Sequence, residues 1–252
     1  MKVVAHRGYS GLYPENTMTA FIKAAEAGAD EIELDVQLSK DGAVVIIHDE
    51  SLERVTGKPG WVRDFTLEEL RTFDVSVLYR GEFGFNPIPS LDEYFSWVKA
   101  TSITTNIELK NSLYYYEGLE EKTIELIRKH GLEGRVIFSS FNHGSLFKCK
   151  KLAPAIPCGL LVGHADAGNA GLYVKSCGME YYHPNIATLT RETVENCHAN
   201  GIELNVWTVN DMAGLLRLET WNCRGIITNY PEVCKVWLAR TFKGAYKQED
   251  RS

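Results

Sequence analysis

The chain has 252 residues, which is the usual length of a single α/β barrel and enough to bury a full hydrophobic core. Hydrophobic residues make up 44% of it and charged residues 24%, a balance typical of globular proteins in water. The net charge is −6, and Lys and Arg are scattered among Asp and Glu without forming a basic stripe, which argues against a nucleic-acid partner.

Short apolar segments alternate with amphipathic helical patterns along nearly the whole chain. Such alternation predicts a parallel sheet, and eight strands predict a closed (β/α)8 barrel, the TIM-barrel fold. The helices expected between strands include Thr17–Ala27, Glu120–Lys129, Arg191–Ala199 and Pro231–Thr241. The expected strands are Val3–His6, Glu31–Val36, Thr104–Lys110, Val136–Ser140, Cys158–Val162, Glu180–His183, Leu204–Thr208 and Gly225–Thr228.

A second apolar strand, Ala43–His48, follows the strand at Glu31 too closely for a parallel crossover. Only the turn Ser39–Gly42 separates the two, whereas a parallel connection needs a dozen or more residues. We therefore expect an antiparallel hairpin appended to the barrel. Because this strand folds back, we expect His48 near the level of Glu33 and Asp35.

The segment 50–102 is too long for a loop between a strand and a helix, and we expect it to form a small insertion over one edge of the barrel. Two capping-box patterns, Thr66 to Glu69 and Ser90 to Glu93, predict helices within it. The last residues, 243–252, are polar and are expected to fray. Residues 1–252 are thus expected to form one barrel domain that carries the insertion.

Acidic side chains gather where predicted strands end, and active sites of such barrels lie at the C-terminal ends of the strands. Residues at i and i+2 share one face of a strand, so Glu33 and Asp35 both point into the barrel, as do Glu108 and Lys110. Three inward carboxylates repel one another unless they are protonated or bind a cation. All-oxygen ligands select Mg²⁺ or Ca²⁺ over zinc. The alternative is that the carboxylates form ion pairs with Arg7 and Lys110.

Two histidines frame this cluster, His6 at the end of the first strand and His48 on the hairpin. A single histidine at a strand end is more often structural. A pair beside carboxylates can divide general base and general acid work, each contributing about 10²–10⁴ in rate. Arg7 and Lys110 would add fixed positive charge for a phosphoryl group. This set suits phosphoryl transfer to an oxygen without a nucleophilic Ser or Cys.

Several short motifs follow one another along the chain. They are His6-Arg7-Gly8, Pro14-Glu15-Asn16-Thr17, Glu33-x-Asp35, Ser39-Lys40-Asp41-Gly42 leading to His48-Asp49, Glu108-x-Lys110, Ser139-Ser140-Phe141, Val206-Trp207-Thr208-Val209-Asn210 and Gly225-Ile226-Ile227-Thr228. In this order they resemble the glycerophosphodiester phosphodiesterase family. The resemblance extends from about Val3 to Pro231 and includes an insertion after the His-Asp pair. A lone His-Arg-Gly is weak evidence, whereas a full set in register is specific.

The resemblance implies an enzyme that hydrolyses a small glycerophosphodiester to glycerol 3-phosphate and an alcohol. It also implies one divalent cation, Mg²⁺ or Ca²⁺, and a cyclic phosphate formed when the glycerol 2-hydroxyl attacks phosphorus. The residues implied are His6 and His48 as the acid–base pair, Arg7 and Lys110 at the phosphate, Trp207 at the mouth near the glycerol moiety, and Glu33, Asp35 and Glu108 at the metal.

Three places leave alternatives open. Asn229 stands where the family usually has Asp, so it can still cap the last helix but offers no charge. Glu15 can serve as a helix cap or as a substrate-binding group, since its loop lies near the mouth. Tyr114, Tyr115 and Tyr116 either form an aromatic wall over the substrate or pack against the insertion.

The six cysteines predict neither a zinc site nor a redox motif. None forms a Cys-x-x-Cys pair, so we expect reduced and mostly buried thiols, with disulfides as the alternative. The chain opens directly on the strand-like run Lys2–Ala5, and no apolar run reaches the length of a membrane span. We expect a cytoplasmic protein without membrane insertion, and the oligomeric state is open.

Three other functions are alternatives to a glycerophosphodiesterase. A lysophospholipase D or a sphingomyelinase D-like enzyme would require an exposed apolar rim and often a secretion signal, and no such signal is present. A non-catalytic barrel would be favoured by the loss of a metal carboxylate or catalytic histidine, and all five are present. A sugar isomerase on this fold would not need the His-Arg and Glu-x-Lys pairs.

Overall fold

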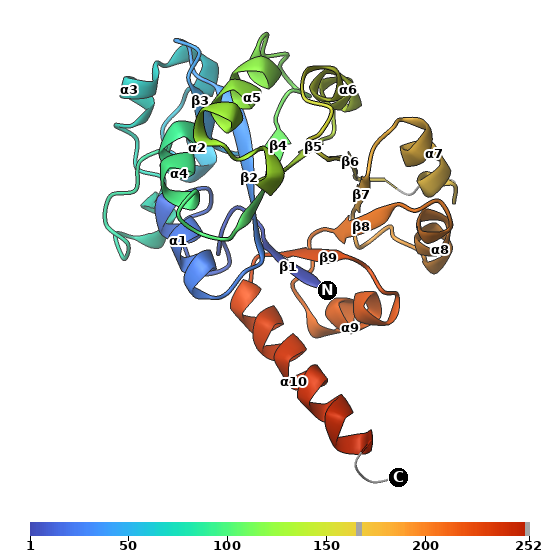
Figure 1. Ribbon diagram of the computed structural model, residues 1–252. Helices are drawn as coiled ribbons and strands as arrows, with labels where there is room; N and C mark the ends of the chain where they lie inside the picture. Colours follow the sequence, from blue (N-terminus) through green and yellow to red (C-terminus); the bar gives the residue numbers. More distant parts are fainter. Residues whose placement is uncertain (165–167, 250–252) are drawn as a thin grey trace.

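Eight parallel strands close into a barrel in this computed structural model, which describes residues 1–164 and 168–249, with side chains up to residue 240 (Figure 1). The first strand pairs with both the second and the last, so the sheet closes on itself. The predicted barrel is confirmed. The strands are β1 (Lys2–Ala5), β2 (Glu31–Leu38), β4 (Thr104–Leu109), β5 (Val136–Ser140), β6 (Cys158–Val162), β7 (Tyr181–Pro184), β8 (Glu203–Val206) and β9 (Gly225–Thr228).

The predicted hairpin is also present, because β3 (Val44–Ile46) runs antiparallel to β2. Its turn requires Gly42, whose φ of +78° is rarely adopted by residues with a side chain. Ser39 stabilises the turn, since its Oγ accepts a hydrogen bond from the Ala43 N–H at 2.9 Å. From the turn beyond Leu38 the chain runs back along β2 to the level of Asp35, whose backbone oxygen accepts from the Ile47 N–H, and His48 follows.

Helices follow the strands and cover the outside of the barrel (Figure 1). α1 (Met18–Glu26) is capped by Thr17, whose side chain accepts from the Ala20 N–H.

α10 (Pro231–Glu249) continues past the predicted end at Thr241 and extends away from the barrel (Figure 1). The predicted polar tail, 243–252, falls partly on residues 250–252, outside the described part of the chain. The other barrel helices are α5 (Leu119–His130), α6 (His143–Leu152), α7 (Ala170–Ser176), α8 (Arg191–Ala199) and α9 (Met212–Thr220), with a 3₁₀ turn η3 (Glu133–Arg135) before β5.

The segment after the hairpin has a hydrophobic cluster of its own. The helices and turns of this segment are α2 (Glu53–Thr56), η1 (Val62–Asp64), α3 (Leu67–Leu70), η2 (Val77–Tyr79) and α4 (Leu91–Val98). The predicted capping box of α3 is complete, because Thr66 and Glu69 bond each other's backbone. α4 packs into the main cluster of the barrel instead. The limits of the insertion, 50–102, stay a prediction. The separate cluster consists of Val45, Ile47, Leu52, Val55, Val62, Leu70, Val75 and Ile88.

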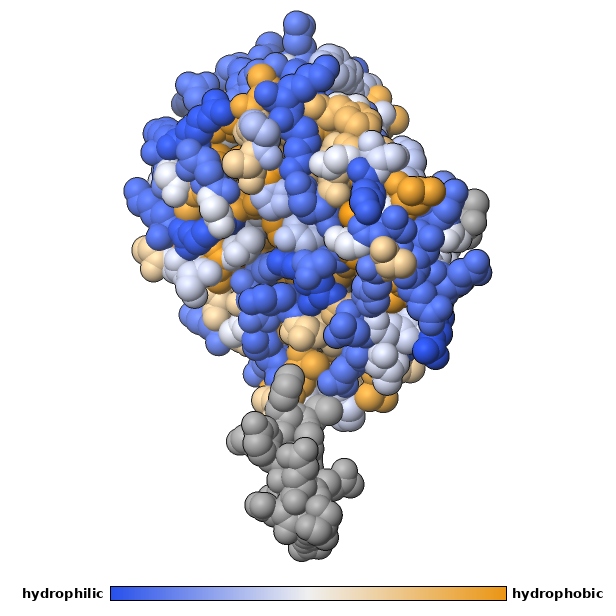
Figure 2. Space-filling view, turned by 45° about the vertical axis from the view of Figure 1, so that its right-hand side comes forward, coloured by the Kyte–Doolittle hydropathy of each residue, from blue (hydrophilic) through white to orange (hydrophobic). Residues whose placement is uncertain are grey.

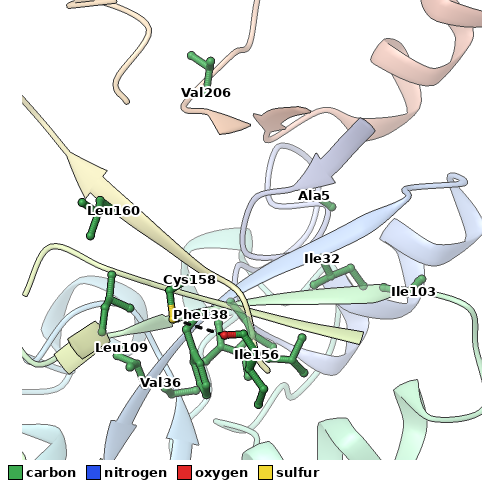
Figure 3. Packing of buried hydrophobic residues seen from close by; sticks show 14 of the residues in the cluster. Ala5, Ile32, Val36, Ile103, Leu109, Phe138, Ile156, Cys158, Leu160 and Val206 are labelled. Atoms are coloured by element: carbon green, nitrogen blue, oxygen red, sulfur yellow. Dashed lines mark hydrogen bonds between the residues drawn. The ribbon is translucent and has the colours of Figure 1, made fainter. Parts of the chain in front are cut away.

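Alternation along β2 divides its side chains between the core and the barrel interior. Ile32, Leu34 and Val36 are fully buried in the main cluster, where Figure 3 shows Ile32 and Val36 among side chains of neighbouring strands. Each buried side chain of this size contributes about 2 kcal/mol to the free energy of folding. Glu33 and Asp35 lie between them in sequence and therefore face the interior.

The surface and the thiols agree with the expectations for a globular chain in water. The face drawn in Figure 2 is largely hydrophilic, with smaller hydrophobic areas between the polar side chains. Among the described helices, none combines the length and apolar composition needed to cross a membrane. The six cysteines are free, and all but Cys177 are buried. The cytoplasmic location stays a prediction.

A buried ion pair lies at the N-terminal end of the barrel. Arg224, just before β9, donates to Glu31 at the start of β2 with an Nη2–Oε1 distance of 2.6 Å. Its Nη1 donates to Asn205 Oδ1 at 2.8 Å. Glu31 is 2% exposed, so this guanidinium is the cation that allows a carboxylate to be buried there.

Replacing Arg224 with Met should lower the free energy of unfolding by about 3–5 kcal/mol, because Glu31 would stay buried without its cation. Urea denaturation followed by circular dichroism measures the loss. Arg191→Ala removes an exposed ion pair with Glu195 and is the control, with little change expected. An Arg224→Met variant as stable as this control would contradict the role of the buried pair.

Candidate active site

Three carboxylates meet at the C-terminal end of the barrel, where Glu33 and Glu108 line a cavity of about 100 Å³ and Asp35 lies buried beside them. Glu33 and Asp35 come from β2 and Glu108 comes from β4, where Asp35 and Glu108 are neighbours in the strand register. One carboxylate oxygen from each lies within 4.8 Å of the others. The structure thus brings together the three residues that the sequence predicts as metal ligands.

Burial and repulsion act differently on these three groups. Burial raises the pKa of Glu33 well above its usual range, and the charges of Asp35 and Glu108 add to the effect. Burial, with the charge of Asp35, also raises the pKa of Glu108. Burial alone would raise the pKa of Asp35 too, but the positive charges around it, first that of Arg7, lower it to about 2. The neighbouring cations therefore do not balance all three carboxylates, which favours a bound cation.

Buried oxygens around the carboxylates also fit a divalent cation. Asp35 Oδ1, Asn106 Oδ1 and Ser139 Oγ are buried and have no hydrogen-bond partner. In the strand register Asn106 lies beside Glu33 and Ser139 beside Glu108, and both line the cavity. Buried polar atoms without a partner are rare in proteins and call for a ligand, an ion or a water. An all-oxygen set of this kind suits Mg²⁺ or Ca²⁺.

Arg7 and Lys110 supply positive charge at the same place, so the predicted ion pairs are present beside the carboxylate cluster. Lys110 Nζ lies 3.0 Å from Glu108 Oε1 and 4.0 Å from Asp35 Oδ1. Arg7 Nε lies 3.5 Å from Asp35 Oδ2, and its backbone N–H donates to Glu33 Oε2 at 2.8 Å. Arg7 has a φ of 54°, which is uncommon for a residue with a side chain and marks a local constraint at the site.

His6 and His48 line the same cavity. His6 Nδ1 lies 2.6 Å from Asn229 Oδ1, and His48 Nδ1 lies 2.6 Å from Asp49 Oδ1. Because both partners are acceptor oxygens, each Nδ1 carries the ring proton and each Nε2 carries the lone pair. His48 Nε2 lies 3.2 Å from Lys110 Nζ. Burial lowers the pKa of His6 to about 4, so this ring is neutral at pH 7.

The loop after β1 brings two more polar side chains to the site. Glu15 accepts a hydrogen bond from Arg7 Nη1 at 2.9 Å, whereas Thr17 caps α1, so the structure favours a site position for Glu15. Asn16 is buried, has a φ of 56°, and donates from Nδ2 to Asp35 Oδ2 at 2.8 Å. Its amide therefore holds one of the three carboxylates.

Aromatic and aliphatic side chains complete the cavity lining. Trp207 and Phe141 contact each other edge to face, with ring centres 5.7 Å apart. Trp207 Nε1 donates to the backbone oxygen of His183 at 2.8 Å, which fixes the orientation of the indole. Leu161 and Ile227 also line the cavity. The site therefore combines charged groups with an apolar wall.

Among the three consecutive tyrosines, Tyr114 and Tyr116 follow the packing alternative. Tyr114 contacts Trp61 at 5.6 Å between ring centres, and the guanidinium carbon of Arg63 lies 3.8 Å from the Tyr114 ring centre. Trp61 and Arg63 belong to the segment 50–102. Tyr116 is buried and donates from its hydroxyl to Gln37 Oε1 at 2.9 Å.

Sequence reasoning assigned no site role to Asp49, Asn106 or Ser139. The sequence could have indicated two of them. Asn106 lies two residues before Glu108 and therefore faces the barrel interior as well, and Ser139 falls at the C-terminal end of a predicted strand. Asp49 follows His48 directly, but whether it turns toward that ring depends on the loop conformation. Only the folded chain shows these contacts.

Comparisons with known proteins agree with the geometry. The model of the glycerophosphoryl diester phosphodiesterase family matches residues 6–233. A glycerophosphodiester phosphodiesterase of Caldanaerobacter subterraneus is 44% identical over 91% of this chain and 94% of its own length. One of Bacillus altitudinis is also 44% identical, over 92% of this chain and 95% of its own length.

A solved structure is similar over almost the whole chain. It is a phosphodiesterase of Oleispira antarctica in complex with its product, sn-glycerol-3-phosphate. It is 30% identical, with a TM-score of 0.84 over 95% of this chain and 97% of its own. The predicted enzyme class, a phosphoric diester hydrolase, is confirmed, and the chain belongs to the glycerophosphoryl diester phosphodiesterase family.

Proposed function

We propose that this protein hydrolyses small glycerophosphodiesters to glycerol 3-phosphate and an alcohol. The observation that carries the proposal is that His6 and His48 share one cavity with Glu33 and Glu108, and that a carboxylate oxygen of Asp35 lies within 4.8 Å of theirs. A similar phosphodiesterase binds glycerol 3-phosphate as its product. A cavity that joins two imidazoles, three carboxylates and an apolar wall suits a substrate with a phosphodiester next to a short polyol.

One divalent cation, Mg²⁺ or Ca²⁺, would be held by Glu33, Asp35 and Glu108. Bound there, the ion would act as a Lewis acid toward a phosphoryl oxygen and would stabilise negative charge in the transition state. The support for this assignment is the close approach of the three carboxylates and the buried oxygens without hydrogen-bond partners.

The two histidines divide the proton transfers. One, neutral, takes the proton of the glycerol 2-hydroxyl as its oxygen attacks phosphorus, and the other, entering the step as imidazolium, donates its Nε2 proton to the alcohol oxygen as its P–O bond breaks. This step leaves a cyclic phosphate. Water then opens the ring to glycerol 3-phosphate, with the same two groups acting in the reverse direction. The support is that the hydrogen bonds to Asn229 and Asp49 hold both rings by Nδ1, so that Nε2 is the nitrogen of each ring left to exchange a proton; that of His48 lies 3.2 Å from Lys110 Nζ.

The remaining site residues bind and orient the substrate. Arg7 and Lys110 place positive charge where the phosphoryl oxygens would lie, since both already lie beside Asp35. Trp207 would pack against the glycerol moiety as part of the apolar wall. Glu15 contributes by holding Arg7.

Release of the headgroup alcohol from a panel of glycerophosphodiesters, lysophospholipids and sphingomyelin tests the proposed substrate class, with glycerol 3-phosphate measured as the second product of the glycerophosphodiesters. Turnover of glycerophosphocholine or glycerophosphoethanolamine is the expected result. Turnover restricted to lysophospholipids or sphingomyelin would favour the phospholipase D-like alternative. A purified protein that hydrolyses none of them would contradict the proposal.

His6→Ala and His48→Ala should each lower kcat by about 10²-fold or more, because each removes one proton-transfer group. Steady-state kinetics and a circular dichroism melt of each variant are the measurements, and the melts should stay close to that of the unsubstituted protein. The exposed His198 on α8 provides the control, and His198→Ala should keep full activity. Wild-type turnover in either site variant would refute the acid–base assignment.

Removal of divalent ions with a chelator should abolish turnover, and Mg²⁺ or Ca²⁺ should restore it, whereas a monovalent salt should not. Isothermal titration calorimetry provides a readout that does not depend on activity. Glu108→Gln should weaken binding of the cation, because it removes a charged ligand of the cluster. Unchanged cation affinity in this variant would argue against the assigned ligands.

A further inference from the structure

Arg54 of α2 uses all three of its guanidinium nitrogens on two carboxylates. Its Nη1 and Nη2 donate to Glu15 Oε2 and Oε1 at 2.9 and 2.7 Å. Its Nε and Nη2 donate to Asp49 Oδ2 and Oδ1 at 2.5 and 3.2 Å. Paired hydrogen bonds of this kind fix the relative orientation of both partners, because the guanidinium is planar and its donors are rigid.

Each of these two carboxylates in turn holds a residue of the active site. Glu15 Oε1 accepts from Arg7 Nη1 at 2.9 Å. Asp49 Oδ1 lies 2.6 Å from His48 Nδ1. A continuous series of contacts therefore connects Arg7, in the loop after β1, with His48, in the loop after β3, and Arg54 is its centre.

The charges along this series alternate. Burial alone would raise the pKa of Glu15, but the hydrogen bonds from Arg54 and the charge of Arg7 lower it below its usual value. Burial would also raise the pKa of Asp49, and the hydrogen bonds from His48 and Arg54 lower it strongly. Both groups are therefore carboxylates, and the guanidinium between them offsets their mutual repulsion.

Arg71, which also lies in the segment 50–102, is a close comparison for Arg54. Arg71 donates from Nη1 to Glu93 Oε2 at 2.5 Å, and the side chains of Arg54 and Arg71 are both 42% exposed. Arg71 has no bond to the residues of the cavity described above. An exposed ion pair contributes little to stability, so the difference between these two arginines lies in what their partners hold.

We propose that Arg54 is a positioning residue, which fixes Arg7 and His48 relative to each other through Glu15 and Asp49. The inference rests on the proposed function, in which Arg7 binds the phosphoryl group and His48 transfers a proton. It gives the segment after the hairpin a part in catalysis, although Arg54 itself does not touch the substrate.

Steady-state kinetics of Arg54→Ala and Arg71→Ala with a glycerophosphodiester test the proposal. Arg54→Ala should lower kcat/KM by about 10²-fold, because small displacements of catalytic groups have effects of that size. A large part of the loss should appear in kcat, since His48 acts in the chemical step. Arg71→Ala should keep the kinetics of the unsubstituted enzyme.

Rescue experiments separate positioning from a general loss of structure. Added guanidinium ion at millimolar concentration should restore part of the activity of Arg54→Ala, because the site is open to solvent, and should not restore that of His48→Ala. Arg54→Lys should retain part of the activity, since an ammonium keeps the charge but cannot form both paired contacts. Melting curves of all variants identify any that fail to fold, and Arg54→Lys serves as the second variant if Arg54→Ala does.

The outcomes distinguish this inference from the proposed function. An unsubstituted protein that hydrolyses no glycerophosphodiester would overturn both. An active unsubstituted enzyme with an equally active Arg54→Ala would overturn only the role of Arg54. Loss of activity that follows a loss of thermal stability, without rescue by guanidinium or by Lys, would show that Arg54 acts through folding and would likewise overturn the positioning role.

Discussion

The active site is arranged around three carboxylates that repel one another in a buried space. Strand alternation turns Glu33 and Asp35 inward while Ile32, Leu34 and Val36 form part of the core, so closing the barrel brings these carboxylates together at its mouth. The neighbouring groups compensate this negative charge in several ways. Arg7 and Lys110 approach as cations, the Asn16 amide donates a hydrogen bond, and the remaining oxygens suit a divalent ion.

This arrangement also costs conformational free energy in the backbone. Arg7 and Asn16 both have positive φ values, and both contact the carboxylate cluster. Such conformations cost about 1–3 kcal/mol each and persist only where surrounding contacts impose them. The tightly packed barrel provides those contacts, and the strain places an arginine N–H on Glu33 and an asparagine amide on Asp35.

The sequence predicts the parts of this site that follow from regular structure. The alternation of strands with helices predicts the barrel, and the alternation of side chains along a strand predicts the inward direction of Glu33, Asp35 and Glu108. The short turn at Gly42 predicts that the chain folds back and carries His48 to the mouth. Contacts made by loops have no such period. The bonds of Arg54 to Glu15 and Asp49 join positions 39 and 5 residues apart, and the bond of Asn229 to His6 spans 223 positions. No pattern along the chain encodes those distances.

The two histidines are held at the same distance by different chemical groups. Both present Nδ1 to an oxygen at 2.6 Å, yet that oxygen belongs to an amide at His6 and to a carboxylate at His48. The carboxylate of Asp49 can be accommodated because Arg54 neutralises it from the other side. His6 lies within the influence of the Asp35 charge, and Asn229 accepts at its Nδ1 without adding a further negative charge. Asn229 keeps the hydrogen bond that orients the imidazole and leaves the charge of the cluster unchanged.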